Sequence, residues 1–131
     1  MVDNMVTTEQ QIKEEEFCEK FLLRLGIVPN KRHTIFTIET FILYCEEREK
    51  GIKNPSLTNL YRIVASTFGT TISAVERGIR YTHNRVFENV NAIEVLTCNS
   101  YLFKGDMKFT NSEFMYFMYM NYKIEERKGD K

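Results

Sequence analysis

The side chains best suited to chemistry in this sequence lie within residues 70–89. At the helical step of about 100° per residue, one arc of this stretch is polar and basic, with Glu76 at its edge: Ser73, Ala74, Arg77, Arg80, Tyr81 and Asn84. The opposite arc is mostly apolar and must face a core: Ile72, Val75, Ile79, Thr82, His83 and Val86. Guanidinium, amide and hydroxyl groups donate hydrogen bonds to phosphates and base edges. The polar arc is therefore a candidate nucleic-acid-binding face.

Another amphipathic helix is predicted directly before this one. Apolar residues recur at helical spacing from Leu57 to Phe68 and stop at Gly69, a residue favoured where a helix ends in a left-handed turn. Ser56 is a suitable N-cap for this helix. Two such helices joined by a turn of about three residues predict a helix-turn-helix, with its recognition helix over residues 71–88.

Two sequence motifs point to a known family. The segment TTISAVERGIRY at residues 70–81 is followed by TNSEF at residues 110–114. Both resemble segments at similar separation in the C-terminal DNA-binding domain of the stage 0 sporulation response regulator family, and LGIVP at residues 25–29 resembles its IGVP-like stretch. The similarity covers about residues 17–128. It implies a transcription regulator that binds double-stranded DNA.

The resemblance also implies roles for single residues. Glu76 and Arg77 match the family's base-reading pair: Arg77 would donate to guanine O6 and N7, and Glu76 would accept from cytosine N4 or orient Arg77. Arg80 and Ser73 match family residues from which we expect phosphate contacts. The complete set of expected DNA-binding residues is Ser73, Glu76, Arg77, Arg80, Tyr81, Asn84 and Arg85.

The chain departs from the family pattern in three ways. Ala74 replaces an arginine, and Gly78 replaces an alanine at a cost of up to about 1 kcal/mol in helix propensity. Specificity can therefore differ from the family's TGTCGAA-like element. The family's regulator also has a phosphate-accepting receiver domain of over a hundred residues, but here about sixteen residues precede the first predicted helix. We therefore expect no phosphorylation control within this chain. The chain is either a stand-alone paralogue or a fragment of a longer protein, and Met1 and the polar leader favour a stand-alone paralogue.

Composition predicts one all-α domain of about six helices over residues 17–128, after a polar leader over residues 1–16. The chain has 131 residues with 43% hydrophobic side chains, only two prolines and six glycines, and no long alternation of apolar and polar residues. Gly26 and Gly51 close the first two predicted helices, and the second begins at Thr34 or Thr37. A shorter apolar helix is expected over residues 92–103.

No sequence pattern indicates catalysis, a metal or another cofactor. Cys18, Cys45 and Cys98 lack metal-ligand spacing, and His33 and His83 are the only histidines, so we expect buried free thiols and a partly buried, satisfied His83. The chain also lacks a secretory signal and a membrane-spanning apolar run. We expect a non-enzymatic protein of the bacterial cytoplasm, associated with the nucleoid of a spore-forming species.

The distribution of charge is more informative than its sum. The net charge is zero, but residues 1–51 carry 7 Lys and Arg against 10 Asp and Glu, and residues 52–131 carry 11 against 8. Because the phosphate contribution of one copy is then modest, we expect a homodimer or a tandem pair on DNA, and a contact with RNA polymerase. The basic cluster of residues 31–33 (Lys31, Arg32 and His33) is either a solvated loop or a clamp for backbone phosphates.

The last predicted helix begins at TNSE, which fits a capping box formed by Thr110 and Glu113. Apolar and aromatic residues from Phe114 to Tyr122 surround this helix, so more than one of its faces must be buried. It is either the centre of the monomer, with tyrosines at the rim, or part of a homodimer contact. The competing function is a protein-interaction module that uses this helix to pair with a full-length relative without binding DNA.

Overall fold

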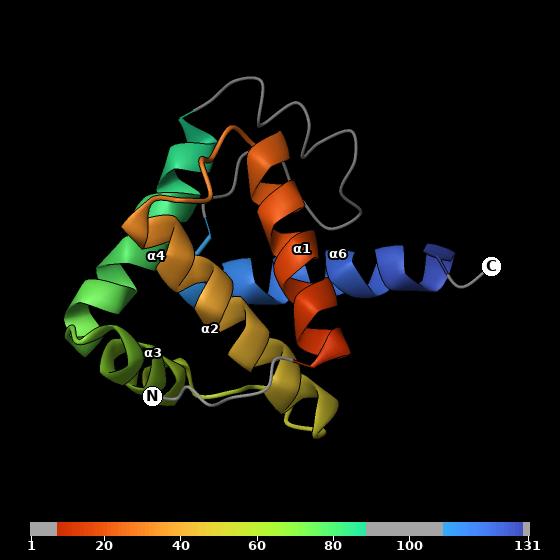
Figure 1. Ribbon diagram of the computed structural model, residues 1–131, viewed down its shortest axis with the longest axis horizontal. Coiled ribbons are helices and arrows are strands. Elements are labelled where there is room, and N and C mark those ends of the chain that lie inside the picture. Colours follow the sequence, from red (N-terminus) through yellow and green to blue (C-terminus); the bar gives the residue numbers. More distant parts are fainter. Residues whose placement is uncertain (1–7, 89–108, 130–131) are drawn as a thin grey trace.

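The chain folds into an all-α structure, as the sequence predicts. A computed structural model describes residues 8–88 and 109–129. Within those ranges the helices are α1 (Glu9–Arg24), α2 (Arg32–Glu49), α3 (Leu57–Phe68), α4 (Ile72–Phe87) and α6 (Asn111–Gly129), and there is no strand (Figure 1). The helix expected over residues 92–103 and Cys98 lie outside the described residues.

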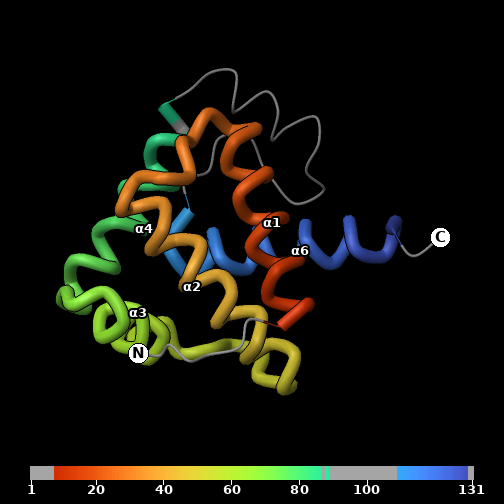
Figure 2. The backbone as a smooth tube through the Cα atoms, in the orientation of Figure 1, coloured from red at the N-terminus to blue at the C-terminus, as the bar shows by residue number. Residues whose placement is uncertain are grey.

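Helix α2 occupies the centre of the arrangement and contacts each of the other four helices (Figure 2). It begins at Arg32, earlier than predicted, and more of its surface is buried than its apolar residues alone indicate. Thr34, Thr37 and Thr40 are fully buried, but Ile35 is partly exposed. Ile38, Phe41 and Cys45, which recur at helical spacing, are also buried. Because other helices cover α2 on several sides, its buried surface includes threonines as well as apolar residues, and Thr37 Oγ1 lies 3.1 Å from Thr82 Oγ1 of α4.

Helix α1 begins at Glu9, so residues 9–16, which the sequence analysis placed in the polar leader, belong to the first helix. Thr8 is the N-cap, and its hydroxyl oxygen accepts from the Gln11 backbone N–H at 3.0 Å. Glu14 is only 2% exposed, and burial raises the pKa of its carboxyl group. Its Oε2 accepts from Gln10 Nε2 at 3.0 Å. The first helix therefore extends well before Phe17, where its apolar pattern begins.

Helices α3 and α4 form the predicted helix-turn-helix. Ser56 caps α3, and α3 ends at Gly69, whose φ of 65° is in the left-handed region favoured by glycine. Thr71 caps α4, because its hydroxyl oxygen accepts from the Ala74 backbone N–H at 3.0 Å. The recognition helix therefore starts at Ile72, one residue later than predicted.

Helix α6 is a core element of the monomer. The capping box is present: the Thr110 backbone N–H donates to Glu113 Oε1 at 2.9 Å, and the Glu113 N–H donates to Thr110 Oγ1 at 3.1 Å. Most of its apolar and aromatic side chains are buried against the rest of the chain: Phe114, Met115, Phe117, Met118, Tyr119 and Tyr122. Tyr116 is 44% exposed. The monomer itself thus buries most of the apolar surface of α6. The sequence analysis had considered a homodimer contact as one way to bury this surface.

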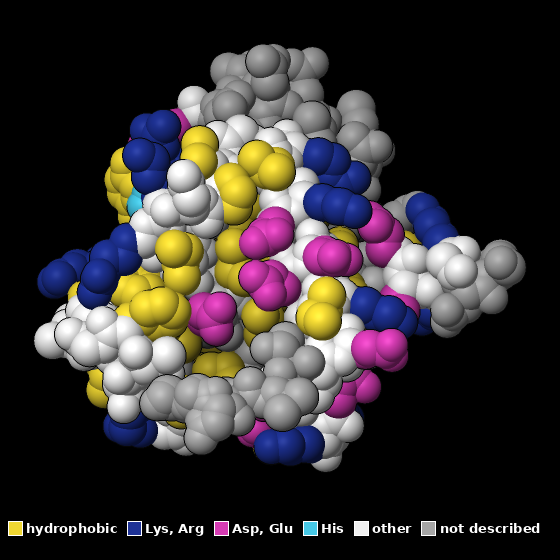
Figure 3. All heavy atoms as spheres, in the orientation of Figure 1, with side chains coloured by type: hydrophobic (Ala, Val, Ile, Leu, Met, Phe, Trp, Pro, Cys, Tyr) yellow, Lys and Arg dark blue, Asp and Glu magenta, His cyan; other side chains and the backbone are white. Residues whose placement is uncertain are grey.

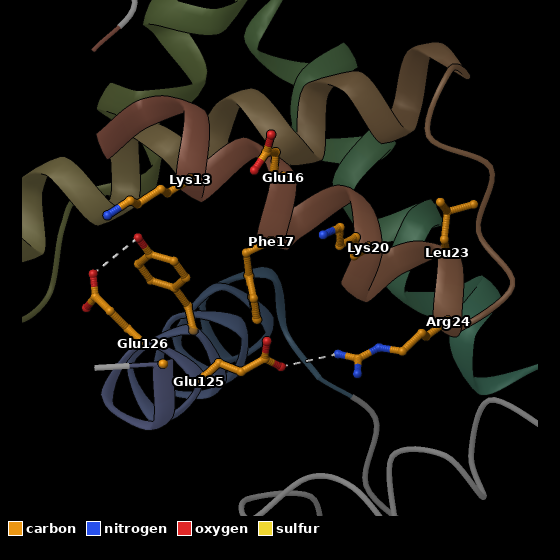
Figure 4. A pocket seen from close by; sticks show the side chains of 10 residues that line it. Lys13, Glu16, Phe17, Lys20, Leu23, Arg24, Glu125 and Glu126 are labelled. Atoms are coloured by element: carbon orange, nitrogen blue, oxygen red, sulfur yellow. Dashed lines mark hydrogen bonds and ion pairs between the residues drawn. The ribbon is translucent and has the colours of Figure 1, made fainter. Parts of the chain in front are cut away.

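A groove with a volume of about 660 Å³ lies between α1 and the C-terminal part of α6. In Figure 4, Lys13 of α1 lies opposite Glu126 of α6, and Arg24 of α1 extends toward Glu125. An ion pair of 3.6 Å between Arg24 and Glu125 crosses one end. No residue of α3 or α4 lines this groove, so it is separate from the helix-turn-helix.

Candidate nucleic-acid interface

The two arcs of α4 face opposite environments, as predicted. Val75, Ile79, Thr82 and Val86 are fully buried, His83 is 1% exposed, and Ile72 is partly buried against the core. Ser73, Arg77, Arg80, Tyr81 and Arg85 are exposed, while Glu76 and Asn84 are partly exposed. All seven expected DNA-binding residues therefore lie on one helix with side chains that solvent reaches.

The ion pair on this face differs from one of the two sequence-based expectations for Glu76. Glu76 Oε2 accepts from Arg80 Nη1 at 2.6 Å, and the two side chains are 35% and 50% exposed. Glu76 thus orients Arg80, one turn further along the helix, rather than Arg77. Among residues 8–88 and 109–129, Arg77 has no hydrogen-bond or ion-pair partner. Its guanidinium is free to bind another molecule.

The basic cluster of residues 31–33 lies beside the C-terminal half of α4. The rings of His33 and Tyr81 form an edge-to-face pair with 4.7 Å between centroids. Arg85 lies 5.9 Å from the centre of the Tyr81 ring and 3.7 Å from Glu88. Burial, with the positive charges of Arg85 and Lys31, lowers the pKa of His33. Lys31 occupies the N-cap position of α2, but its side chain makes no capping hydrogen bond. The N-terminus of α2 next to the recognition helix is therefore basic.

Gly78 lies where α4 crosses α2. A Cβ atom at this position would be 3.1 Å from Cδ2 of Phe36 and 3.4 Å from Cα and Cβ of His33. Beside it, Thr82 Oγ1 donates to the Gly78 carbonyl oxygen at 2.9 Å and lies 3.1 Å from Thr37 Oγ1. The missing side chain therefore allows the two helices to approach closely. This packing accounts for a residue that helix propensity alone disfavours.

His83 is held from the start of α6. Its Nε2 lies 2.7 Å from Asn111 Oδ1, and burial lowers its pKa. The Asn111 Nδ2 group also donates to the Tyr61 hydroxyl and to the Glu76 carbonyl oxygen, at 3.0 and 3.1 Å. Sequence reasoning gave TNSE a capping role and missed this contact. The signal available was the inward position of His83, which required a polar partner.

A cleft of about 590 Å³ opens next to this contact, between α4 and the starts of α3 and α6. Its walls include Arg80 and Asn84 of the outer face, together with Thr58, Thr110 and Ser112.

Figure 3 shows the side of the molecule on which α1 and α2 lie. There, acidic side chains gather over α1 and α2, and Lys and Arg side chains project at the edge where α4 lies.

Comparison with known families identifies the fold. The chain matches the family described as the C-terminal domain of the sporulation initiation factor Spo0A over residues 18–122, which is most of its length. The chain belongs to this family. The Spo0A C-terminal family is a DNA-binding effector domain of a sporulation regulator, so the helix-turn-helix is that of a DNA-binding transcription regulator. No match was found among curated proteins or among solved structures.

The described parts of this Spo0A-type domain also bear on membrane spans, metal ligands and thiols. No helix there is long and apolar enough to cross a membrane. No group of three or more His, Cys, Asp or Glu side chains in those parts could hold a metal ion. Cys18 and Cys45 are buried free thiols, as predicted, and burial raises the pKa of both. Thiols protonated in this way are poor nucleophiles.

Proposed function

We propose that the protein is a sequence-specific regulator of transcription that places α4 in the major groove of double-stranded DNA. One observation carries this proposal: Arg77 is exposed on the outer face of the second helix of a helix-turn-helix and has no partner within the described chain. An arginine in this position can donate two hydrogen bonds to guanine O6 and N7. The membership of the Spo0A C-terminal family supports the same role.

The other residues of the face divide into base-reading and positioning groups. Only Oε2 of Glu76 accepts from Arg80, so the other carboxylate oxygen can accept from cytosine N4 while the ion pair remains. Arg80, Ser73 and Arg85 contact phosphates, with Tyr81 and Asn84 between them. Lys31 and Arg32 extend the phosphate contacts from the start of α2, the clamp that the sequence analysis considered. Phosphate contacts fix the orientation on DNA, and base contacts determine the sequence read.

Two copies act together on DNA, as a homodimer or a tandem pair. The chain is neutral overall, and each copy offers only a few cations to the duplex. The binding free energy of one helix-turn-helix is therefore small, and two half-sites about one helical turn apart add the contributions of two copies. A contact with RNA polymerase then couples the bound pair to transcription.

The test is fluorescence anisotropy with a duplex carrying a TGTCGAA-like element and with a scrambled duplex. Arg77→Ala should weaken binding to the preferred duplex by about 1 to 3 kcal/mol, or roughly 5- to 150-fold, and change binding to the scrambled duplex little. Arg127→Ala is the matched control, because it removes the same charge from the exposed end of α6. The control should leave the ratio of the two affinities unchanged.

Two results would count against the proposal. If the native protein binds both duplexes equally, the TGTCGAA-like element is not its target, and selection from a pool of random duplexes would replace the fixed site. If that selection also enriches no sequence, sequence-specific binding is wrong. The interaction-module hypothesis would then be the better account.

A further inference from the structure

One side chain at the start of α6 connects three helices. Asn111 is the first residue of α6, and its Oδ1 lies 2.7 Å from His83 Nε2 of α4. Its Nδ2 donates to the Glu76 carbonyl oxygen of α4 at 3.1 Å and to the Tyr61 hydroxyl of α3 at 3.0 Å. Asn111 is only partly exposed. Both helices of the helix-turn-helix are thus attached to the same amide group.

The orientation of this amide is determined by its partners. The backbone carbonyl of Glu76 can only accept, so the NH₂ group of Asn111 must face it, and the amide oxygen then faces His83. His83 Nε2 therefore carries the proton. Nδ1 of His83 is buried and has no partner within the described residues. Asn111 uses its oxygen and both N–H groups in this arrangement, and no other residue type offers the same donors and acceptor at this length.

The two attachments on α4 restrict its movement. Glu76 and His83 are separated by about two helical turns, so they lie on the same side of α4 and are both bonded to Asn111. Rotation of α4 about its axis would lengthen at least one of the two bonds, and so would sliding along the axis. Glu76 directly precedes Arg77. The hydrogen bonds of Asn111 therefore fix the backbone from which the Arg77 side chain reaches a base edge, and a binding site tolerates displacements of only about 0.5 Å and 10–20°.

From this geometry we infer that Asn111 is a positioning residue for the DNA-reading face, and that it sets the sequence specificity of the protein by fixing the rotation of α4. This inference rests on the proposed function, since it concerns the same face. Asn111 itself need not touch DNA. Loss of its hydrogen bonds leaves every cation of the face in place, so phosphate contacts survive, while the aim of Arg77 at a base edge is lost.

The experiment compares Asn111→Ala with Glu113→Ala. Glu113→Ala removes the capping bond to the Thr110 N–H from the same turn but leaves the contacts of Asn111 intact. The native protein is first used to select its preferred duplex from a random pool. The ratio of its affinities for that duplex and a scrambled one is then measured for each variant, well below the unfolding temperature.

We expect Asn111→Ala to reduce the ratio at least tenfold, with binding to the scrambled duplex nearly unchanged. Glu113→Ala should lower the unfolding temperature and keep the ratio. If Asn111→Ala keeps the native ratio, or if both variants lose it equally, the inference is wrong. Either of these results leaves the proposed function intact. Failure of the native protein to select any duplex overturns the proposed function instead, and the inference with it.

Asn111→Asp keeps the test decisive if Asn111→Ala does not fold. Asp has nearly the same shape and still accepts from His83, but an ionised carboxylate cannot donate to the Glu76 carbonyl oxygen or to Tyr61. This variant should fold and lose specificity at least tenfold. Asn111→Asp with the native affinity ratio would overturn the inference.

Discussion

At the scale of single residues, two arginines on one face of α4 are prepared differently for binding. Arg80 is already held by Glu76 at 2.6 Å. A half-exposed pair with this spacing contributes only about 0.3 to 0.5 kcal/mol to stability, so its main effect is to orient the guanidinium. Arg77 is not held within the described chain and must be ordered on binding, at a cost of about 0.5 to 1.5 kcal/mol. Arg80 is therefore pre-oriented, and Arg77 adapts to the base.

His83 makes the stability of the fold depend on pH. Burial lowers the pKa of His83 in the folded state, and this effect exceeds that of the hydrogen bond to Asn111, which raises the pKa. The folded form therefore resists a proton that the unfolded chain binds below about pH 6.5. The stabilisation is present in full above that pH and is lost as the pH falls to the folded-state pKa, at up to about 1.4 kcal/mol per pH unit.

The prediction is tested with urea unfolding of the native protein and of His83→Gln between pH 7 and pH 5.5. The free energy of unfolding should fall less with decreasing pH in the variant. His33 also has a lowered pKa, so both proteins are measured in a His33→Gln background as the control. Equal pH dependence with and without His83 would contradict this account.

At the scale of elements, the crossing of α2 and α4 explains why the recognition helix contains a glycine. Alanine at position 78 would gain up to about 1 kcal/mol in helix propensity. Its Cβ, however, would lie 3.1 Å from the ring of Phe36. That ring is buried and packs edge-to-face on Phe68 with 5.8 Å between centroids, so it has little room to move. Overpacking of this kind costs about 1 to 3 kcal/mol.

We expect Gly78→Ala to destabilise the protein by about 1 kcal/mol, as the net of these two effects. In a Phe36→Leu background the ring edge is absent, and the same substitution should become neutral or stabilising. A double-mutant cycle from chemical unfolding measures this coupling directly. The explanation fails if Gly78→Ala stabilises the native sequence or if the two changes are additive.

At the scale of the whole molecule, charge is separated although its sum is zero. Burial raises the pKa of both Glu15 and Glu39. The nearby Glu19 and Glu16 raise the pKa of Glu15 further, and Glu15 of α1 raises the pKa of Glu39 of α2 further. Figure 3 shows acidic side chains gathered over α1 and α2, and Lys and Arg side chains at the edge where α4 lies. DNA that approaches α4 therefore meets cations first. This separation can steer association at low salt.

The salt dependence of binding tests how far the basic surface extends. Lys31→Ala with Arg32→Ala should weaken binding to preferred and scrambled duplexes alike, and reduce the slope of log K against log salt by about 2, or about 0.9 for each lost phosphate contact. Lys13→Ala with Lys20→Ala removes equal charge beside the groove between α1 and α6 and should leave the slope unchanged. An unchanged slope in the first variant would show that residues 31–33 are a solvated cluster.

Local sequence alone determined much of this protein. The helical pattern placed buried Val75 and Ile79 opposite exposed Arg77, and Gly69 and Thr110 marked a helix end and a helix start. Such features depend on residues a few positions apart, whose effects on backbone and burial are visible in one sequence. The family motifs were also visible, because TTISAVERGIRY and TNSEF are continuous segments.

Only the tertiary structure decided which distant residues meet. The pairing of Asn111 with His83 and Glu76 joins α6 to α4, and Gly78 meets Phe36 across two helices. The burial of α6 within the monomer and the position of residues 31–33 beside Tyr81 were likewise open from the sequence. A periodic pattern shows that a helix has a face to bury, but not which partner covers it, because packing depends on the shapes of all the helices together.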